Sequence, residues 1–311
     1  MNIAKRTCAP IAFFAYNRPV HTHNTLRALS RCLDAASSEI FVFIDGPKPG
    51  AVAEEIQLIE RVQEVANSLD WPGKINIVAA LENKGLTRSI TEGISEVLKY
   101  HDRVIVVEDD VECGVDFLRF CNHALDFYED DERVMHIGGF IYPSKATLPD
   151  AFIARPVLVW GWATWKRAWD KFSLNAREQL IQLEERGQTI EFNLNDSYDN
   201  YKLLQMKANG EIDTWDVCWY ASVFLNNGYG VYPGKSLIKN TGIDGTGSHF
   251  TGSSIMQLPP PSRIDTDKME WPHLLLPEYE ASIEKAIRKW NNPGRYTKLF
   301  FRICNKLKSL V

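Results

Sequence analysis

Short apolar runs alternate with helical repeats along the first third of the chain. Between the runs, apolar residues such as Ile56, Ile59 and Val62 recur three or four positions apart, which is the spacing of an amphipathic helix. Strands that alternate with helices predict a parallel sheet with helices on both faces, and hence an α/β fold. Four runs have the length and composition of buried strands: residues 10–16, 39–45, 74–80 and 103–109.

Polar residues cluster where these predicted strands end. The carboxyl ends of parallel strands lie on one edge of a sheet, and ligands bind outside that edge. The pattern therefore predicts that these polar side chains converge on one rim. They are Asn17 and Arg18 after the first run, Asp45 at the end of the second, residues 82–88 after the third and residues 108–110 at the end of the fourth.

The pattern changes in the second half of the chain. Strand–helix alternation weakens, tryptophans gather in residues 160–169, and a polar, helix-like segment covers residues 174–209. A Gly-rich stretch follows at residues 240–250. We divide the chain into a first half that binds a ligand, a second half built onto the same sheet, and a C-terminal extension. Their bounds are residues 1–119, 120–260 and 261–311.

The C-terminal end is basic and amphipathic. Its lysines and arginines from Lys285 onward have no acidic counterpart. This pattern is typical of a helix on a membrane surface, and the alternative is a helix docked on the protein body with solvated lysines. The apolar residues that fall roughly on one helical face are Leu299, Phe300, Ile303, Leu307 and Leu310.

Composition and charge restrict the class of protein. The chain has 311 residues, of which 45% are hydrophobic and 24% charged, as in ordinary globular proteins. A net charge of −5 gives no reason to expect nucleic acid as a partner. The six cysteines include no CxxC pair, and no apolar stretch is long enough for a signal peptide or a membrane span. We therefore expect a cytoplasmic protein with reduced thiols.

Three adjacent carboxylates end the fourth predicted strand: Glu108, Asp109 and Asp110. They repel one another, and burial makes each negative charge more costly. One of them could cap the following helix, but three indicate a bound cation. Oxygen ligands on a rigid turn suit Mg²⁺ or Mn²⁺, and Mg²⁺ commonly uses one or two protein carboxylates together with substrate phosphates.

The sequence around this triplet, VVEDDVECGVDF, resembles the acidic signature of nucleotide-sugar glycosyltransferases with the GT-A fold. Its EDD form is similar to that of the N-acetylglucosaminyltransferase I family and its bacterial relatives. The resemblance implies a Rossmann-like, mostly parallel sheet flanked by helices, with an acceptor-binding C-terminal half. It covers roughly residues 10–250. The other stretches that carry it are AYNRP, FIDGP, NKGLTRSI, TWDVCW and WGWATWKRAW.

The resemblance implies how a metal and a donor sugar would be held. Asp110 would be the direct metal ligand, with Mn²⁺ or Mg²⁺ as cofactor. Glu108 and Asp109 would contact the donor sugar or its ribose. His249, in the Gly-rich stretch, either adds a metal or diphosphate ligand or is an exposed loop histidine.

The same resemblance assigns the nucleotide contacts. Arg18 matches the arginine of the first-strand loop, and Asp45 matches the aspartate that binds the uracil or ribose portion. Arg88 would be a further contact to the nucleotide or its diphosphate. The chain has neither a P-loop nor a GxGxxG motif after the first predicted strand, so diphosphate binding would depend on a metal and arginine.

Asp216 matches the family's Trp-Asp pattern, so the resemblance implies that it is the general base. We expect Trp215 and Trp219 to shield it from water, which would make it a stronger base. Asp213 is the competing candidate, although it could instead cap a helix that begins near Thr214. Inverting transfer needs one base at the acceptor hydroxyl and stabilisation of the departing diphosphate.

Trp160, Gly161 and Trp162 are the residues that we expect at the acceptor cleft. Tryptophan rings can stack on the faces of sugars, although most tryptophans fill cores. Glycine permits close approach of a ligand to the backbone.

Together these features predict an inverting, metal-dependent glycosyltransferase. It would move a sugar such as N-acetylglucosamine from a UDP-sugar to a hydroxyl of a glycan or a lipid-linked saccharide in bacterial surface polysaccharide synthesis, at the inner leaflet if the tail binds membrane. A nucleotidyltransferase acting on sugar phosphates is one alternative, but it would usually carry a Gly-rich loop where AYNRPVHTHNT has no glycine. A non-catalytic sugar-binding protein is another, and the intact carboxylates argue against it.

Overall fold

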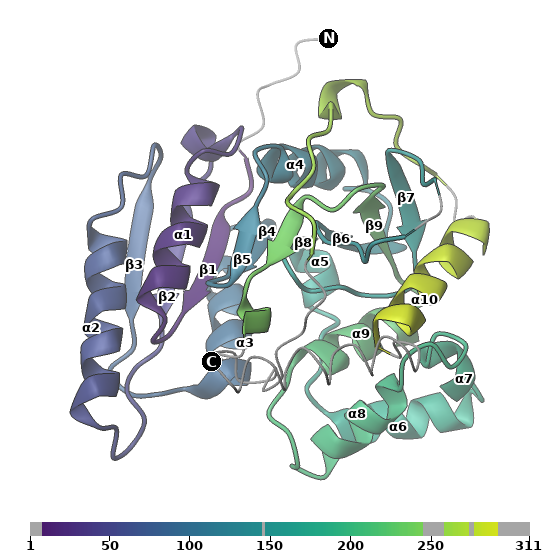
Figure 1. The fold of residues 1–311 in the computed structure, drawn as a ribbon. Coiled ribbons are helices and arrows are strands. Elements are labelled where there is room, and N and C mark those ends of the chain that lie inside the picture. The colour runs from purple at the N-terminus through teal and green to yellow at the C-terminus, as the bar shows by residue number, and fades with distance from the viewer. Residues whose placement is uncertain (1–7, 145–146, 245–257, 274–276, 292–311) are drawn as a thin grey trace, which may run out of the picture.

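An eight-stranded sheet forms the centre of the computed structural model, which describes residues 8–144, 147–244, 258–273 and 277–291 (Figure 1). Its strand order is β3-β2-β1-β4-β8-β6-β9-β7. The strands are β1 (Ile11–Ala15), β2 (Ile40–Ile44), β3 (Ile75–Ala79), β4 (Arg103–Glu108), β6 (Val134–Gly138), β7 (Ala151–Ala154), β8 (Trp162–Trp165) and β9 (Tyr229–Pro233).

The first half of the sheet is the predicted parallel one. Strands β1 to β4 coincide with the four predicted apolar runs, and each is parallel to its neighbour in the order β3-β2-β1-β4. The predicted helices between them are also present: α1 (Pro19–Leu29), α2 (Ala53–Asn67) and α3 (Gly85–Val97). The α/β fold with a largely parallel sheet flanked by helices is therefore confirmed.

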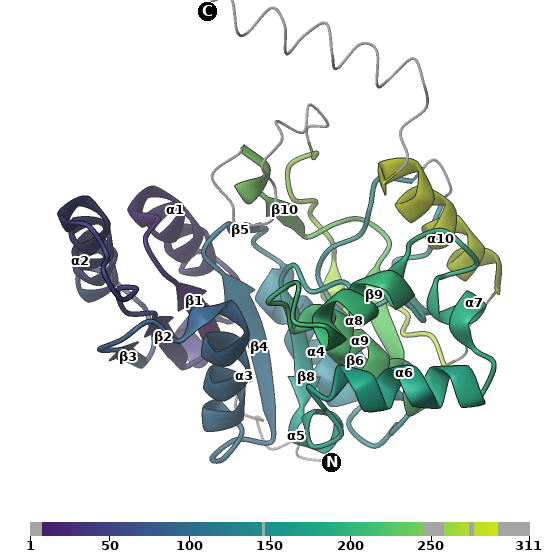
Figure 2. The same cartoon turned by 90° about the horizontal axis from the view of Figure 1, so that it is seen from below.

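Alternating residues of the strands face two different hydrophobic layers. Phe13 of β1 and Ile105 of β4 pack with α1, α2 and α4 (Phe117–Phe127), whereas Phe14 and Val106 pack with α3 and α9 (Asp216–Leu225). The helices therefore cover both faces, as Figure 2 shows for α1 and α3 on opposite sides of the sheet. This burial leaves the carboxyl ends of β1, β2 and β4 as the polar edge.

The second half of the sheet is mixed. Strand β8 is antiparallel to both β4 and β6, β6 is parallel to β9, and β7 is antiparallel to β9. The polar segment predicted as helix-like is three separate helices that pack with α9. They are α6 (Ala176–Glu185), α7 (Thr189–Phe192) and α8 (Asn200–Ala208).

Several short elements complete the described structure. A two-stranded antiparallel sheet pairs β5 (Val111–Cys113) with β10 (Ile238–Asn240), directly after the acidic triplet. Helix α10 (Pro277–Asn291) packs near β7. The remaining helical elements are η1 (Ala35–Ser37), α5 (Lys166–Trp169), η2 (Gly242–Asp244) and η3 (Thr266–Lys268).

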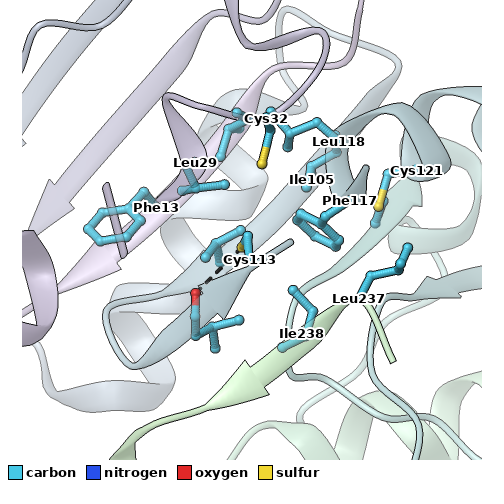
Figure 3. Close-up of a cluster of buried hydrophobic side chains, with 14 of the residues drawn as sticks. Phe13, Leu29, Cys32, Ile105, Cys113, Phe117, Leu118, Cys121, Leu237 and Ile238 are labelled. Carbon is cyan, nitrogen blue, oxygen red and sulfur yellow. Dashed lines mark hydrogen bonds between the residues drawn. The ribbon is translucent and has the colours of Figure 1, made fainter. Parts of the chain in front are cut away.

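Three cysteines that are distant in the sequence lie in one hydrophobic cluster, which includes residues of β5 and β10. Figure 3 shows Cys32, Cys113 and Cys121 there among aliphatic and aromatic side chains. All three are free thiols, and burial raises the pKa of each. Protonated thiols in an apolar setting behave as small hydrophobic residues, so these cysteines have a packing role.

Two features of the sequence bear on membranes. In the described ranges, we find no helix that is both long enough and apolar enough to cross a membrane. The basic amphipathic tail beyond residue 291 lies outside the described residues.

Candidate active site

The acidic triplet occupies a tight turn between β4 and β5. Glu108 ends β4 beside Phe14 of β1, and the turn at Asp109 and Asp110 leads directly into β5. Distant residues fix the turn through its backbone carbonyls. The Thr25 hydroxyl donates to the Asp109 carbonyl at 2.6 Å, and the Thr241 N–H and hydroxyl donate to the Asp110 carbonyl at 2.8 and 3.0 Å. The carboxylates are thus held on a rigid support.

Arg18 lies directly against this triplet. Its guanidinium donates from Nη2 to Asp109 Oδ1, from Nε to Asp109 Oδ2 at 3.3 Å and from Nη2 to Asp110 Oδ2 at 3.1 Å. Burial opposes the charge on Arg18, but the two aspartates outweigh it and raise the pKa of the guanidinium. The structure therefore confirms that Arg18 reaches the same rim as the triplet, where one cation faces three carboxylates.

The triplet carries more negative charge than Arg18 balances. Burial, followed by the charges of Asp110 and Asp109, raises the pKa of Glu108 to about 8. Burial also raises the pKa of Asp109 to about 6, although Arg18 opposes the shift. Groups in this state favour a nearby positive charge, because a cation would stabilise their ionised forms.

Asp110 is the carboxylate best placed to meet a cation from solvent. Its side chain is 17% exposed, compared with 4% for Asp109, and one hydrogen bond to Arg18 engages it. Within the described residues, no three Asp, Glu, His or Cys side chains are arranged to hold a metal ion among themselves. The donor set therefore fits an ion that takes one protein carboxylate and completes its shell with substrate phosphates and water.

Asp45 lies at the end of β2, where the sequence predicts it, but backbone groups already engage its carboxylate. Oδ1 accepts from the N–H groups of Gly46 and Lys84 at 2.9 and 2.8 Å. Oδ2 accepts from Asn83 Nδ2 and the Gly85 N–H, both at 3.0 Å. Asp45 thus ties the loop before α3 to β2, and its contact to a nucleotide stays a prediction.

Arg88 is not joined to the triplet. It is exposed on α3, and its Nε donates to Glu92 one turn further along the same helix at 3.1 Å. The structure places this arginine in a surface ion pair, so a nucleotide contact would require a different side-chain conformation.

Asp216, from the second half of the chain, begins α9 and is exposed. Its Oδ1 accepts from the Thr214 hydroxyl and from the Val217 N–H at 2.8 Å. Its charge adds to the raised pKa of Glu108, which places the two carboxylates within electrostatic range. The structure therefore brings the predicted base toward the triplet.

The expectation that tryptophans shield Asp216 is wrong, because Asp216 is exposed while Trp215 and Trp219 are 2% and 0% exposed. Residues four apart in a helix share one face, so both rings enter the core. Asp216 is one position on from Trp215 and points away from that face. Its accessibility suits contact with a substrate rather than activation by burial.

Asp213 does not cap the helix that follows it. Helix α9 has Trp215 at its N-cap position and no side-chain cap. Asp213 instead pairs with Lys207 Nζ at 3.3 Å and lies at the start of α3. Burial opposes its ionisation, but hydrogen bonds from Thr87 and Lys207 outweigh that effect and lower the pKa of Asp213. Asp213 therefore links α8 to α3.

The tryptophan stretch contains both a half-buried and a fully buried ring. Trp160 is half-buried and packs on Phe140, with ring centroids 4.6 Å apart. Trp162 is 0% exposed and stacks on Trp215 at 5.6 Å, so its predicted contact with an acceptor is wrong. It lies on the β8 face that packs against α3 and α9, and no sugar can reach its ring.

Gly161 has a structural reason to be glycine. Its φ of +63° is in the left-handed region, and a Cβ there would lie 2.7 Å from Ile238 Cδ1. Its carbonyl accepts from the Gly139 N–H at 2.7 Å. The predicted close approach is therefore to the protein's own β10.

The structure adds candidate functional residues that the sequence did not indicate. Tyr142 and Tyr198 lie near Asp216, whose charge adds to burial in raising the pKa of each phenol. Thr25 and Thr241, which hold the acidic turn, are 84 and 131 residues from their partners. No local pattern marks such residues, because only the tertiary fold brings them together. His249 lies outside the described residues.

Comparisons with known proteins give fold-level similarity only. No family model matches the sequence, and no curated protein matches it. The Staphylococcus aureus protein TarS matches at 14% identity and a TM-score of 0.28, over 41% of this chain. The chain spans only 21% of the length of TarS.

Two further solved structures overlap more of the chain. A Bacillus anthracis protein proposed to be a glucose-1-phosphate thymidylyltransferase, in complex with sucrose, has 12% identity and a TM-score of 0.38, over 75% of this chain and 90% of its own. An active-site mutant of LgtC has 9% identity and a TM-score of 0.37, over 69% of this chain and 70% of its own. Similarities this weak leave the activity to be argued from the site.

Proposed function

We propose that this protein is an inverting, metal-dependent glycosyltransferase of the GT-A type. It would move a sugar, such as N-acetylglucosamine, from a UDP-sugar to a hydroxyl of a glycan or a lipid-linked saccharide. The observation that carries the proposal is the rigid acidic turn at the carboxyl end of β4. This turn has more negative charge than Arg18 balances, and it lies within electrostatic range of Asp216. The resemblance of the EDD sequence to that family supports it.

The donor side is formed by the first half of the chain. Asp110 would hold Mn²⁺ or Mg²⁺, and a bound ion would supply positive charge against the leaving diphosphate. Glu108 and Asp109 would orient the donor sugar or ribose. Arg18 fixes the two aspartates and would hold the nucleotide, assisted by Asp45.

The acceptor side is formed by the second half of the chain. Both hydrogen bonds that the described residues make to the Asp216 carboxylate end on Oδ1, which leaves Oδ2 to take a proton from the acceptor hydroxyl. The hydroxyl oxygen would then attack the anomeric carbon as the diphosphate departs. Trp160 and Tyr142, whose ring centroids are 6.2 Å apart, would form the wall against the acceptor sugar.

The division of labour follows from this scheme. Residues 1–119 would bind the nucleotide-sugar, residues 120–260 would bind the acceptor and carry the base, and residues 261–311 would form the extension with the basic tail. A lipid-linked acceptor would place the enzyme at the inner leaflet of the membrane, where the tail would meet anionic lipid.

Thermal unfolding with UDP and Mn²⁺ tests the donor site. A ligand at one hundred times its Kd stabilises the folded state by about 2.7 kcal/mol, so UDP should raise the melting temperature in Mn²⁺ but not in EDTA. Asp110→Asn should abolish this shift, whereas Asp70→Asn, at an exposed position on a different loop, should retain it. An equal shift in Asp110→Asn would contradict the assignment of the metal ligand.

A donor screen tests the reaction. Release of the corresponding nucleoside diphosphate from one donor among UDP-, GDP- and dTDP-sugars would support glycosyl transfer. Release of pyrophosphate from a nucleoside triphosphate with a sugar phosphate would assign a nucleotidyltransferase instead. UDP binding with no release from any donor would assign a non-catalytic binding protein.

A further inference from the structure

A groove of about 480 Å³ lies beside the acidic turn, between α1 and the β5–β10 pair. Helix α1 and β5 are neighbours in both Figure 1 and Figure 2. Thr25 and Thr241 belong to the groove wall, and the same two residues hold the backbone of the acidic turn. The groove is therefore next to the candidate active site.

The last turn of α1 and the turn that follows it supply positive charge to this groove, from Arg27 and Arg31. Arg27 and Arg31 are four residues apart and exposed, and within the described part of the chain neither side chain has a hydrogen-bond or ion-pair partner. Asn24 lies on the same stripe, three residues before Arg27, and adds an amide. Two guanidinium groups that line one groove can each present a fork of N–H donors to the same anion.

The acidic residue in the lining does not cancel this charge. Glu112 of β5 faces Lys239 of β10 in the strand register, with Lys239 Nζ 4.0 Å from Glu112 Oε2. Glu112 is thereby offset by its own neighbour, and the two arginines remain unbalanced. Solvated surface arginines are common, but these two line a groove whose volume is in the usual range for small-molecule sites, about 300–1,000 Å³.

We infer that this groove binds a phosphate-bearing ligand, at a site separate from that of the donor diphosphate. Arg27 and Arg31 would hold the phosphate oxygens, and Asn24 would donate a further hydrogen bond. Val20 and Ala28, also in the lining, give the groove apolar surface for the remainder of the ligand. The inference stands on the groove and its charge, and it does not depend on which reaction the acidic turn supports.

Calorimetric titration with pyrophosphate in EDTA tests the site without a contribution from a metal. The double variant Arg27→Gln and Arg31→Gln should weaken binding by about tenfold or more, since it removes two charge-assisted contacts. Arg61→Gln, which removes an exposed arginine from α2, should leave the affinity unchanged. Binding by the wild type should also weaken as salt is raised.

Vesicles distinguish the source of the phosphate. If the wild type binds pyrophosphate but not phosphatidylglycerol vesicles, the ligand is a free phosphate compound. If it also binds those vesicles, and the double variant loses both, the ligand is a lipid phosphate. Equal binding by the wild type and the double variant, or no binding of either probe by the wild type, would overturn the inference.

One further measurement separates this inference from the proposed function. The double variant should keep the stabilisation by UDP and Mn²⁺, because neither arginine belongs to the acidic turn. Both substitutions are at exposed positions, Arg27 in the last turn of α1 and Arg31 in the turn that follows, and glutamine is a good helix former, so the fold should persist.

Discussion

At the scale of single residues, the acidic turn depends on how its charges are compensated. Asp109 is 3% exposed, and the guanidinium of Arg18 contacts both of its oxygens. A buried carboxylate that loses its cation either stays ionised at a large cost in desolvation free energy or takes up a proton. Arg18 therefore has a stabilising role that precedes any contact with a substrate.

Arg18→Gln should lower the free energy of unfolding by about 2–4 kcal/mol, because it leaves Asp109 buried without its cation. Arg88→Gln is the matched control, since Arg88 makes only an exposed pair with Glu92 and its loss should cost about 0.5 kcal/mol or less. Urea unfolding without metal measures both. Similar losses in the two variants would show that the Arg18 pair does not stabilise the turn.

His136 provides a second residue-scale feature, in the core beside Trp162 and Trp219. It is 0% exposed, and burial lowers its pKa to about 3. The Trp219 indole donates to Nδ1 at 3.3 Å, so the ring is neutral and its Nε2–H donates to the Leu158 carbonyl at 3.1 Å. Protonation would therefore place a second donor against the indole N–H.

This histidine should make the protein less stable in mild acid. The unfolded chain binds a proton below the usual pKa of 6.5, whereas the folded chain does not until about 3, so stability falls as pH drops below 6.5. The loss should be about 2 kcal/mol at pH 5. Urea unfolding at pH 7.5 and 5 should show that the free energy of unfolding falls less in His136→Gln than in the wild type. The exposed His23→Gln should match the wild type, and equal losses in all three would refute the assignment.

At the scale of elements, local patterns predicted the first half of the molecule well. Strands β1 to β4 follow from short, continuous apolar runs and helices α1 to α3 from the helical period of 3.6, both of which a short window of sequence carries. The convergence of Arg18 and Glu108–Asp110 followed from the parallel topology. The environments of Trp162 and Asp216 did not, because they depend on which helix covers β8 and on the direction in which α9 presents its first turn.

Gly161, just before β8, lies against Ile238 of β10, so a substitution there tests this packing contact. Gly161→Ala should lower the free energy of unfolding by about 2–4 kcal/mol, from left-handed strain and from contact of the new Cβ with Ile238. Gly187→Ala is the matched control, because Gly187 has a φ of +65° with nothing within 4 Å. Its free energy of unfolding should fall by only about 1–2 kcal/mol, because this substitution adds backbone strain without a packing clash. Equal losses, measured by urea unfolding, would exclude a packing contribution at Gly161.

At the scale of the whole molecule, one sheet joins the two proposed halves. Strand β4, which ends in the triplet, pairs with β8, and Trp160 and Gly161 directly precede β8. Asp213 adds a side-chain link between α8 and the start of α3. The proposed donor and acceptor residues are thus carried by a single continuous support, which would keep Asp216 at a fixed position relative to the acidic turn.

Amide variants distinguish the roles of Asp213, which precedes α9, and Asp216, which begins it. Asp216→Asn should reduce turnover by about a hundredfold or more, because an amide cannot take the acceptor proton, while UDP affinity in Mn²⁺ stays unchanged. Asp213→Asn should keep turnover within a few-fold and cost about 0.5–1 kcal/mol of stability, since it weakens an exposed link to Lys207. Steady-state rates with the donor found in the screen, beside UDP titrations, measure both effects. Full turnover in Asp216→Asn together with a large loss in Asp213→Asn would move the base to Asp213, and the lowered pKa of Asp213 argues against that outcome because a carboxylate held by Lys207 and Thr87 is a weaker base.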